Sequence, residues 1–236
     1  MKKTINKLII TAALVSPLTA CVNTMTTNIN QNATTYPVAA VLKQARLNGV
    51  NKTLITDLNE VMGDQDITIT MNYKRDPIDM NNPQLTTFNK QQVIKTNSVS
   101  EIKINEQTLY TLNAEEYIMA DSLMYAGTNT ANFDIDIVTQ NFTPPATAQI
   151  GAHGKLYEGI SSALEDKAET IPMLGTWELN AANNHTAELC TIEKHDNQGE
   201  STICYTINQQ GDILDTQVSG SFIITPGEPP VNFVSE

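Results

Sequence analysis

The sequence predicts a mainly β protein of the α+β class, with a short helical hairpin near its start followed by antiparallel sheets. Three observations favour this class. Apolar and polar residues alternate along many short segments, Gly, Asn and Asp recur between these segments, and only 17% of the residues are charged. Alternation is typical of a strand with one buried face, the intervening residues favour turns, and the low charged fraction argues against a disordered acidic chain.

Two short helices are expected at the start of the folded region. Pro37 suits the first position of a helix, and Gly49 suits its end. Four apolar residues lie on one face of this helix: Val38, Val41, Leu42 and Ala45. A second helix is expected from residue 51 or 52 to Gly63. Its apolar side carries Leu54, Leu58, Val61 and Met62.

Strands are expected from residue 66 onward. In the first half of the chain, the segments with strand character are 67–73, 93–96, 101–104, 108–112 and 133–138. The Pro-containing segment 75–84 is expected to be a long loop, and residues 114–126 fit a helix or a strand equally well. The Thr-Pro-Pro-Ala-Thr segment at 143–147 is the best candidate for an internal boundary.

The second half of the chain has the pattern of a series of strands separated by turns. These strands are expected at 155–160, 175–179, 186–194, 201–208 and 214–225, before the Pro-rich segment 226–230. Such spacing favours a β-sandwich or a small barrel. We therefore divide the folded chain into a region of helices and short strands at 36–142 and a C-terminal antiparallel β region at 149–236. The length also fits one domain that contains both regions.

The first twenty residues have the pattern of a secretory signal. Lys2, Lys3 and Lys7 precede an apolar stretch from Leu8 to Val15. A helix that spans a bilayer needs roughly 20 apolar residues, so this stretch is too short to do so. Residues 1–20 are therefore expected to be removed as the chain is exported.

The signal ends in Leu-Thr-Ala-Cys at 18–21, which resembles the lipobox of bacterial lipoproteins. The resemblance implies that Cys21 receives diacylglycerol, becomes the mature N-terminus and is acylated again, for example with palmitate. Val22 follows where an aspartate would signal inner-membrane retention, so the position resembles the outer-membrane pattern. The alternative is an ordinary signal cut after Ala20 that leaves Cys21 as a free thiol, a liability in an oxidising compartment. Residues 21–35 lack periodicity and are expected to form a flexible tether.

With Cys21 assigned to lipid, Cys190 and Cys204 remain as an even pair in an exported protein, which predicts a disulfide. A hairpin with its turn centred on Asn197 places the two cysteines directly opposite each other. The same register gives an apolar face that pairs Leu189 with Tyr205, Ala187 with Ile207 and Thr191 with Ile203. We expect this face to pack inward. The more polar face carries the bridge, Glu188 with Thr206, and Lys194 with Glu200.

Two other interpretations of this cysteine pair have less support. A redox-active pair would be expected to have Cys-x-x-Cys spacing, which is absent here. A metal site would have only His185 or His195 nearby, with no spacing typical of zinc ligands.

The net charge of the mature chain limits the classes of partner that we expect it to bind. Without residues 1–20 there are 11 basic and 26 acidic residues, a net charge of −15. This charge argues against a nucleic-acid partner, because phosphates require a basic surface. It also opposes attraction to anionic lipid, so attachment to the membrane is expected through the lipid on Cys21.

The remaining candidate sites are weak. Asp134 and Asp136 share one strand face and could bind a cation, but such like charges are usually solvated. Asp64-Gln65-Asp66 lacks the later glycine and glutamate of a calcium loop. Trp177, the only tryptophan, is expected in the core or at the barrel closure. His153 is better explained as a loop residue than as a metal or haem ligand. Nothing in the sequence places the pair Glu115-Glu116 or the pair Glu165-Asp166 in one cleft as a catalytic dyad.

The sequence predicts no catalytic residue, no cofactor and no metal ligand, because no nucleophile, zinc-protease or phosphate-loop motif occurs. We expect a non-catalytic, lipid-anchored envelope lipoprotein whose β domain binds a protein or a small ligand, or supports envelope assembly. The alternative is a surface-displayed lipoprotein that interacts with a host or a nutrient. Some bacterial surface lipoproteins that capture haem or host proteins share the outline of a helical front part and a β-barrel back part. An extracytoplasmic enzyme is a third class.

Overall fold

The computed structural model describes residues 34–57, 68–163, 169–183, 185–196, 199–222 and 231–235. The chain from Thr34 to Glu236 forms one compact unit. The signal peptide, Cys21 and most of the tether lie outside the described residues, as do Asp64-Gln65-Asp66 and Glu165-Asp166. The described residues are mainly strand, which confirms the predicted fold class. No described helix is long and apolar enough to cross a membrane.

The described elements are one helix, α1 (Val38–Asn48), and fifteen strands. The strands of the first half are β1 (Thr35–Tyr36), β2 (Val50–Asp57), β3 (Thr68–Arg75), β4 (Leu85–Phe88), β5 (Gln91–Ile104), β6 (Gln107–Met119), β7 (Tyr125–Thr130) and β8 (Asp134–Asn141). The strands of the second half are β9 (Ala148–Gln149), β10 (His153–Ala163), β11 (Thr170–Ala181), β12 (Ala187–His195), β13 (Gly199–Ile207), β14 (Ile213–Phe222) and β15 (Val231–Ser235).

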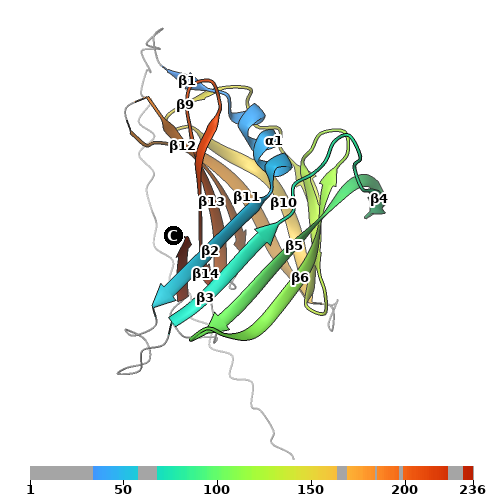
Figure 1. Ribbon diagram of the computed structural model, residues 1–236. Helices are drawn as coiled ribbons and strands as arrows, with labels where there is room; N and C mark the ends of the chain where they lie inside the picture. The colour runs from blue at the N-terminus through green and yellow to red at the C-terminus, as the bar shows by residue number, and fades with distance from the viewer. Residues whose placement is uncertain are drawn as a thin grey trace, which may run out of the picture. The chain divides into compact units, whose positions relative to one another are not determined.

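Thirteen of these strands form a single antiparallel sheet that closes on itself (Figure 1). Its order is β3-β2-β15-β14-β13-β12-β11-β10-β8-β7-β6-β5-β4. β3 also pairs with β5 over residues 69–75 and 98–104, so the sheet becomes a ring of twelve strands with β4 attached outside the closure. The expected choice between a sandwich and a barrel is therefore decided in favour of a barrel. Closure leaves few backbone groups at an open edge.

The first predicted helix is confirmed, whereas the second is wrong. Val38, Val41, Leu42 and Ala45 are all buried on one face of α1. Residues 50–57, where the second helix was expected to begin, instead form β2, and Leu54 pairs with Met71 of β3. Pairing with β3 on one side and β15 on the other supplies backbone hydrogen bonds that close the ring, and this non-local gain outweighs the local helical pattern.

Several predicted short strands join into longer ones. The segments 93–96 and 101–104 belong to one strand, β5, and residues 114–119 extend β6 rather than forming a helix. β5 and β6 pair along nearly their whole length, from Val93 with Met119 to Ile104 with Gln107. The predicted boundary at 143–147 lies between β8 and β9, and β8 pairs directly with the following strand β10 in the ring. Strands from both predicted regions therefore share one barrel.

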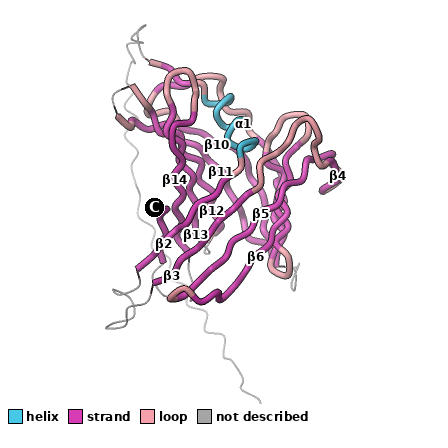
Figure 2. The backbone as a smooth tube through the Cα atoms, in the orientation of Figure 1, coloured by secondary structure: helices cyan, strands magenta, loops and turns pink. Residues whose placement is uncertain are grey.

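The two faces of the barrel wall have different chemistry. One face meets α1, which lies inside one end of the ring (Figure 2). This inner core includes α1 residues together with Leu179, Leu189 and Ile207. The outer face carries exposed ion pairs, such as Lys95 with Glu115 at 2.8 Å and Lys194 with Glu200 at 2.8 Å. The wall face that packs against α1 therefore borders the lumen, and the face with the exposed ion pairs is directed to solvent.

Candidate functional site

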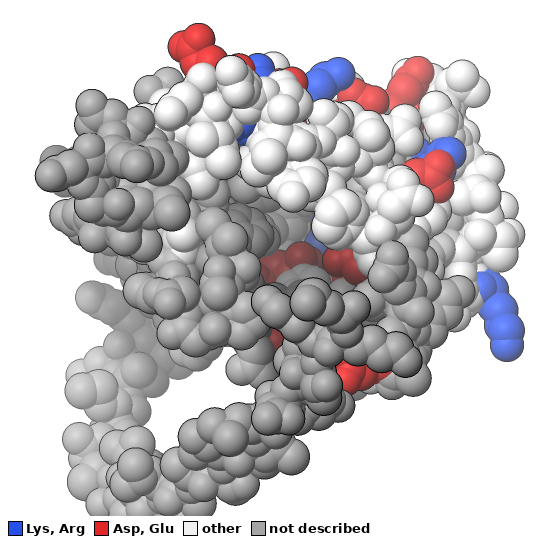
Figure 3. Space-filling view, turned by 90° about the horizontal axis from the view of Figure 1, so that it is seen from below, with Lys and Arg blue, Asp and Glu red and all other residues white. Residues whose placement is uncertain are grey.

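The lumen contains a cavity of about 410 Å³ beneath α1. Leu42, Ala45 and Arg46 of α1 line one side, and inward-facing residues of most barrel strands line the rest. The apolar lining residues include Leu54, Met71, Leu112, Leu156, Ile203 and Val218. The polar lining residues include Tyr73, Arg75, Glu116, Tyr125, Asp136, Tyr157, Glu193, His195 and Tyr205. In the view from below, acidic side chains lie deep in a hollow of the molecule (Figure 3).

One group of polar residues surrounds Arg75 on β3. Its Nη1 lies 3.7 Å from Oε2 of Glu116. The Arg75 side chain is only 10% exposed, and the Glu116 side chain is 12% exposed. Nη2 of Arg75 donates to the carbonyl oxygen of Ala45, at 2.9 Å, in the last turns of α1. The Tyr73 hydroxyl donates to Oε1 of Glu116, at 3.2 Å. This ion pair therefore connects the helix to two strands of the wall.

A second group brings together Asp136 of β8 with Glu193 and His195 of β12. Each residue offers one possible ligand atom, and these three atoms all lie within 4.8 Å of one another. Nε2 of His195 is 3.2 Å from Oε1 of Glu193, and the Tyr157 hydroxyl donates to Oε2 of the same carboxylate. Oδ1 of Asp136 is buried and has no hydrogen-bond partner among the described residues. This group offers two carboxylates and one imidazole to the cavity.

The pKa values of the residues in and beside this group are shifted from their ordinary values. Burial raises the pKa of the Asp136 carboxyl to about 7, although a hydrogen bond from Ser161 acts in the opposite direction. The hydrogen bond with Glu193 raises the pKa of the His195 imidazole. Burial also raises the pKa of the Tyr157 hydroxyl, and the nearby charge of Glu193 adds to this. Perturbed groups that converge in a cavity are typical of functional sites.

A glycine on the intervening strand allows Tyr157 to reach Glu193. Gly175 of β11 pairs with Tyr157 on one side and with Glu193 on the other. A Cβ at Gly175 would lie 2.3 Å from the Tyr157 ring. The Tyr157 ring therefore occupies the space above β11 that a side chain at position 175 would fill, and its hydroxyl reaches across β11 to β12.

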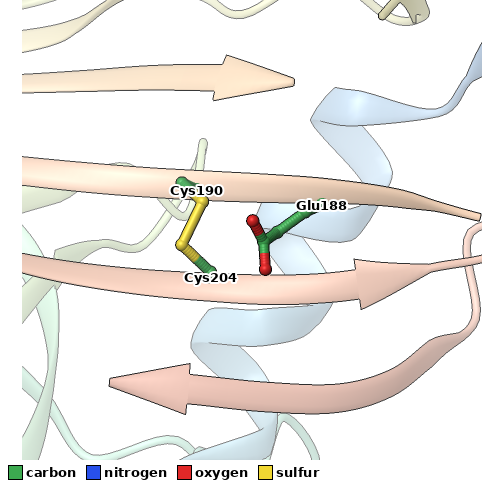
Figure 4. A group of neighbouring side chains, drawn as sticks. All are labelled: Glu188, Cys190 and Cys204. Carbon is green, nitrogen blue, oxygen red and sulfur yellow. A yellow bond between two sulfur atoms is a disulfide. The ribbon is translucent and has the colours of Figure 1, made fainter. Parts of the chain in front are cut away.

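The predicted disulfide is confirmed, together with its register. Cys190 and Cys204 are bonded, with their Cα atoms 4.0 Å apart, and they are directly paired across β12 and β13. Leu189, Ala187 and Thr191 pair with the expected partners, and Leu189 and Tyr205 belong to the inner core. The bridge occupies the opposite face, with the Glu188 side chain beside it (Figure 4). Both sulfur atoms are used in the bridge, so they supply no thiolate for a metal ion.

The expectation that Asp134 and Asp136 form a solvated face is wrong for Asp136. This residue is 7% exposed and lines the lumen. The other face of β8, with Ile135 and Ile137, packs instead against an outer cluster that contains Phe88 and Tyr117. Because Phe88 covers the apolar side from outside, the carboxylate side of β8 faces inward.

Of the other described candidates from the sequence, only Glu116 lines the cavity. Glu115 and Glu116 occupy opposite faces of β6, where Glu115 pairs with Lys95 and Glu116 with Arg75. His153 is exposed at the start of β10. Trp177 is 4% exposed in the inner core, as predicted.

Sequence reasoning missed the inward positions of Glu193 and His195. The predicted hairpin register already contains the signal, because these residues share their strand face with Leu189 and Thr191. Polar residues at the end of an inward apolar row indicate that the row enters a polar cavity. No comparable local signal marks Arg75 or Tyr157, whose roles depend on the closure of the ring and on Gly175.

Comparison with known proteins yields no protein-family model, no curated protein and no solved structure that matches this chain.

Proposed function

We propose that this protein is a non-catalytic envelope lipoprotein that binds a small ligand inside its barrel. The observation that supports this proposal is the cavity of about 410 Å³, where apolar and polar side chains converge. Ligand sites in proteins are typically clefts of roughly 300–1,000 Å³ with a few placed polar groups. The lumen has this size and this mixture.

Unpaired polar atoms in the lumen also favour a ligand. Oδ1 of Asp136 and Nε of Arg75 are buried without a hydrogen-bond partner among the described residues. Each such atom costs about 1–3 kcal/mol when no ligand or water satisfies it. A ligand with polar groups would recover that free energy on binding.

The proposed anchor is a lipid on Cys21. The basic and apolar segments of residues 1–20 and the Leu-Thr-Ala-Cys sequence at 18–21 support diacylglycerol attachment and further acylation. More than one acyl chain is needed for stable membrane attachment. Val22 supports sorting to the outer membrane. The mass of the mature N-terminal peptide tests the anchor, since it should carry acyl chains that are lost in Cys21→Ala.

The binding role is tested by filling the lumen. Ala114 lines the cavity on β6, whereas its neighbour Asn113 is exposed on the outer face. The uncharged dye N-phenyl-1-naphthylamine serves as the probe, because the lumen carries several acidic side chains, and its fluorescence is titrated against the full-length protein. Wild type and Asn113→Trp should bind one dye molecule, and Ala114→Trp should lose this binding.

A second lumen variant guards against misfolding. Ser100→Phe fills the same cavity from β5, and circular dichroism reports whether each variant retains its strands. Equal dye binding by the Ala114 and Asn113 variants would place the dye outside the lumen and overturn the proposal. Absence of dye binding by the wild-type protein would also overturn it.

A further inference from the structure

Three metal-ligating side chains converge in the lumen from two strands that are not neighbours. β10 and β11 separate β8, which carries Asp136, from β12, which carries Glu193 and His195. The ligand atoms nevertheless lie within 4.8 Å of one another. Side chains from β8 and β12 therefore meet over the inner face of the two strands between them.

We propose that Asp136, Glu193 and His195 form a binding site for a divalent first-row transition-metal ion. The inference deepens the proposed function and rests on it, because it names the ligand class of the same cavity.

The Asp136 carboxylate distinguishes this site from an ordinary acidic cluster. The residue is only 7% exposed, lines the cavity and leaves Oδ1 without a partner. An unpaired carboxylate oxygen in a buried position is costly, and a bound cation relieves that cost. Glu193 lies within the same group and adds a second carboxylate, so the local charge favours a cation.

The donor set selects the class of ion. One imidazole nitrogen and two carboxylate oxygens suit Zn²⁺, Mn²⁺ or Fe²⁺. Calcium prefers six to eight oxygen ligands, and magnesium retains water in a nearly ideal octahedron, so neither matches a set with an imidazole. With bonds of about 2.1 Å, the ligand atoms around a tetrahedral zinc ion stand roughly 3.4 Å apart, so the side chains of this group would draw together around the ion.

Neighbouring residues hold the carboxylates in place. Tyr157 donates to Oε2 of Glu193, which leaves Oε1 directed toward His195. The Ser161 hydroxyl donates to the Asp136 carboxylate, and Ser161 pairs with Asp136 across β8 and β10. Hydrogen bonds of this kind orient metal ligands and typically change metal affinity by about 10- to 100-fold. The site has such partners for both carboxylates.

Isothermal titration of the full-length protein with ZnCl₂, after removal of metals with a chelator, tests the inference. Wild type should bind one ion. Asp136→Asn and His195→Gln should each weaken binding by about 100-fold, and Tyr157→Phe should weaken it by about 10-fold. Asp134→Asn is the matched control, because it removes the same charge from the same strand and the same cavity. It should retain binding within a few-fold of wild type.

The visible absorption spectrum with Co²⁺ gives a second readout that does not depend on affinity. Wild type should give the intense bands of a four- or five-coordinate ion, and His195→Gln should alter them. A wild type that binds no Zn²⁺, or equal losses in Asp134→Asn and Asp136→Asn, would overturn the metal site. Dye binding in the lumen would then still support the proposed function, so the two failures are distinguishable.

Discussion

Tyr157 on β10 donates a hydrogen bond to Glu193 on β12, although the complete strand β11 lies between them. Both residues pair in register with Gly175, and the Tyr157 ring occupies the space where a side chain at this position would be. The position of one buried carboxylate in the lumen therefore depends on the absence of a single Cβ on the neighbouring strand.

Replacement of Gly175 by alanine is expected to destabilise the barrel by about 1–3 kcal/mol, because the new Cβ would lie 2.3 Å from the ring and overpack the lumen. The free energy of unfolding in urea measures this effect. Gly151→Ala provides the comparison. A Cβ at this position meets no atom within 4 Å, so the only cost is the strain of a side chain at a positive φ of 90°. A residue other than glycine at positive φ costs about 1–2 kcal/mol, so the loss at Gly175 should be the larger of the two. Equal losses at the two positions would contradict the steric argument.

The ion pair between Arg75 and Glu116 gives a second prediction. Glu116→Gln should destabilise the protein by about 3–5 kcal/mol, because it leaves the buried guanidinium of Arg75 without a counter-charge. Adding Arg75→Met to this variant should recover part of the loss, since the unpaired charge is then removed. Urea unfolding of both variants measures the difference. A double variant no more stable than Glu116→Gln would argue against a charge effect.

Removal of the disulfide is expected to lower the free energy of unfolding by about 3 kcal/mol, as the chain-entropy relation gives for a loop of this length. The double variant Cys190→Ala/Cys204→Ala should show this loss in urea unfolding. Addition of a reductant should destabilise the wild type by a similar amount. The reductant should leave the double variant unchanged, and a further loss there would mean that another thiol is involved.

Stability should fall at alkaline pH through Tyr117. Burial, together with a hydrogen bond to Glu115, raises the pKa of this hydroxyl to about 12, above its ordinary value near 10. A raised folded-state pKa means that the stabilisation is complete below pH 10 and is lost as the pH rises toward 12. Tyr117→Phe should therefore lose less stability over this window than wild type does.

The urea midpoint between pH 9 and 12 measures the effect of pH, and absorbance at 295 nm follows tyrosine ionisation. Tyr110→Phe, at an exposed position, is the control for the substitution itself. An identical alkaline loss in wild type and Tyr117→Phe would contradict the assignment to Tyr117.

Local patterns in the sequence determined the features that depend on neighbouring segments. The alternation of residues 187–207 and the turn near Asn197 predicted the β12–β13 register, the inward face and the disulfide. The apolar spacing from Val38 to Ala45 predicted α1 and its buried side. These features follow from sequence because a hairpin or an amphipathic helix is defined by residues close together in the chain.

The tertiary structure decided the features that depend on distant pairing. Residues 50–57 form a strand because β3 and β15 lie on either side of it. Asp136 faces the lumen because an outer cluster with Phe88 takes the apolar side of β8. Alternation reveals that a strand has two different faces, but only the closed ring determines which face is inside. For this protein, that choice assembles two carboxylates and one imidazole in the cavity.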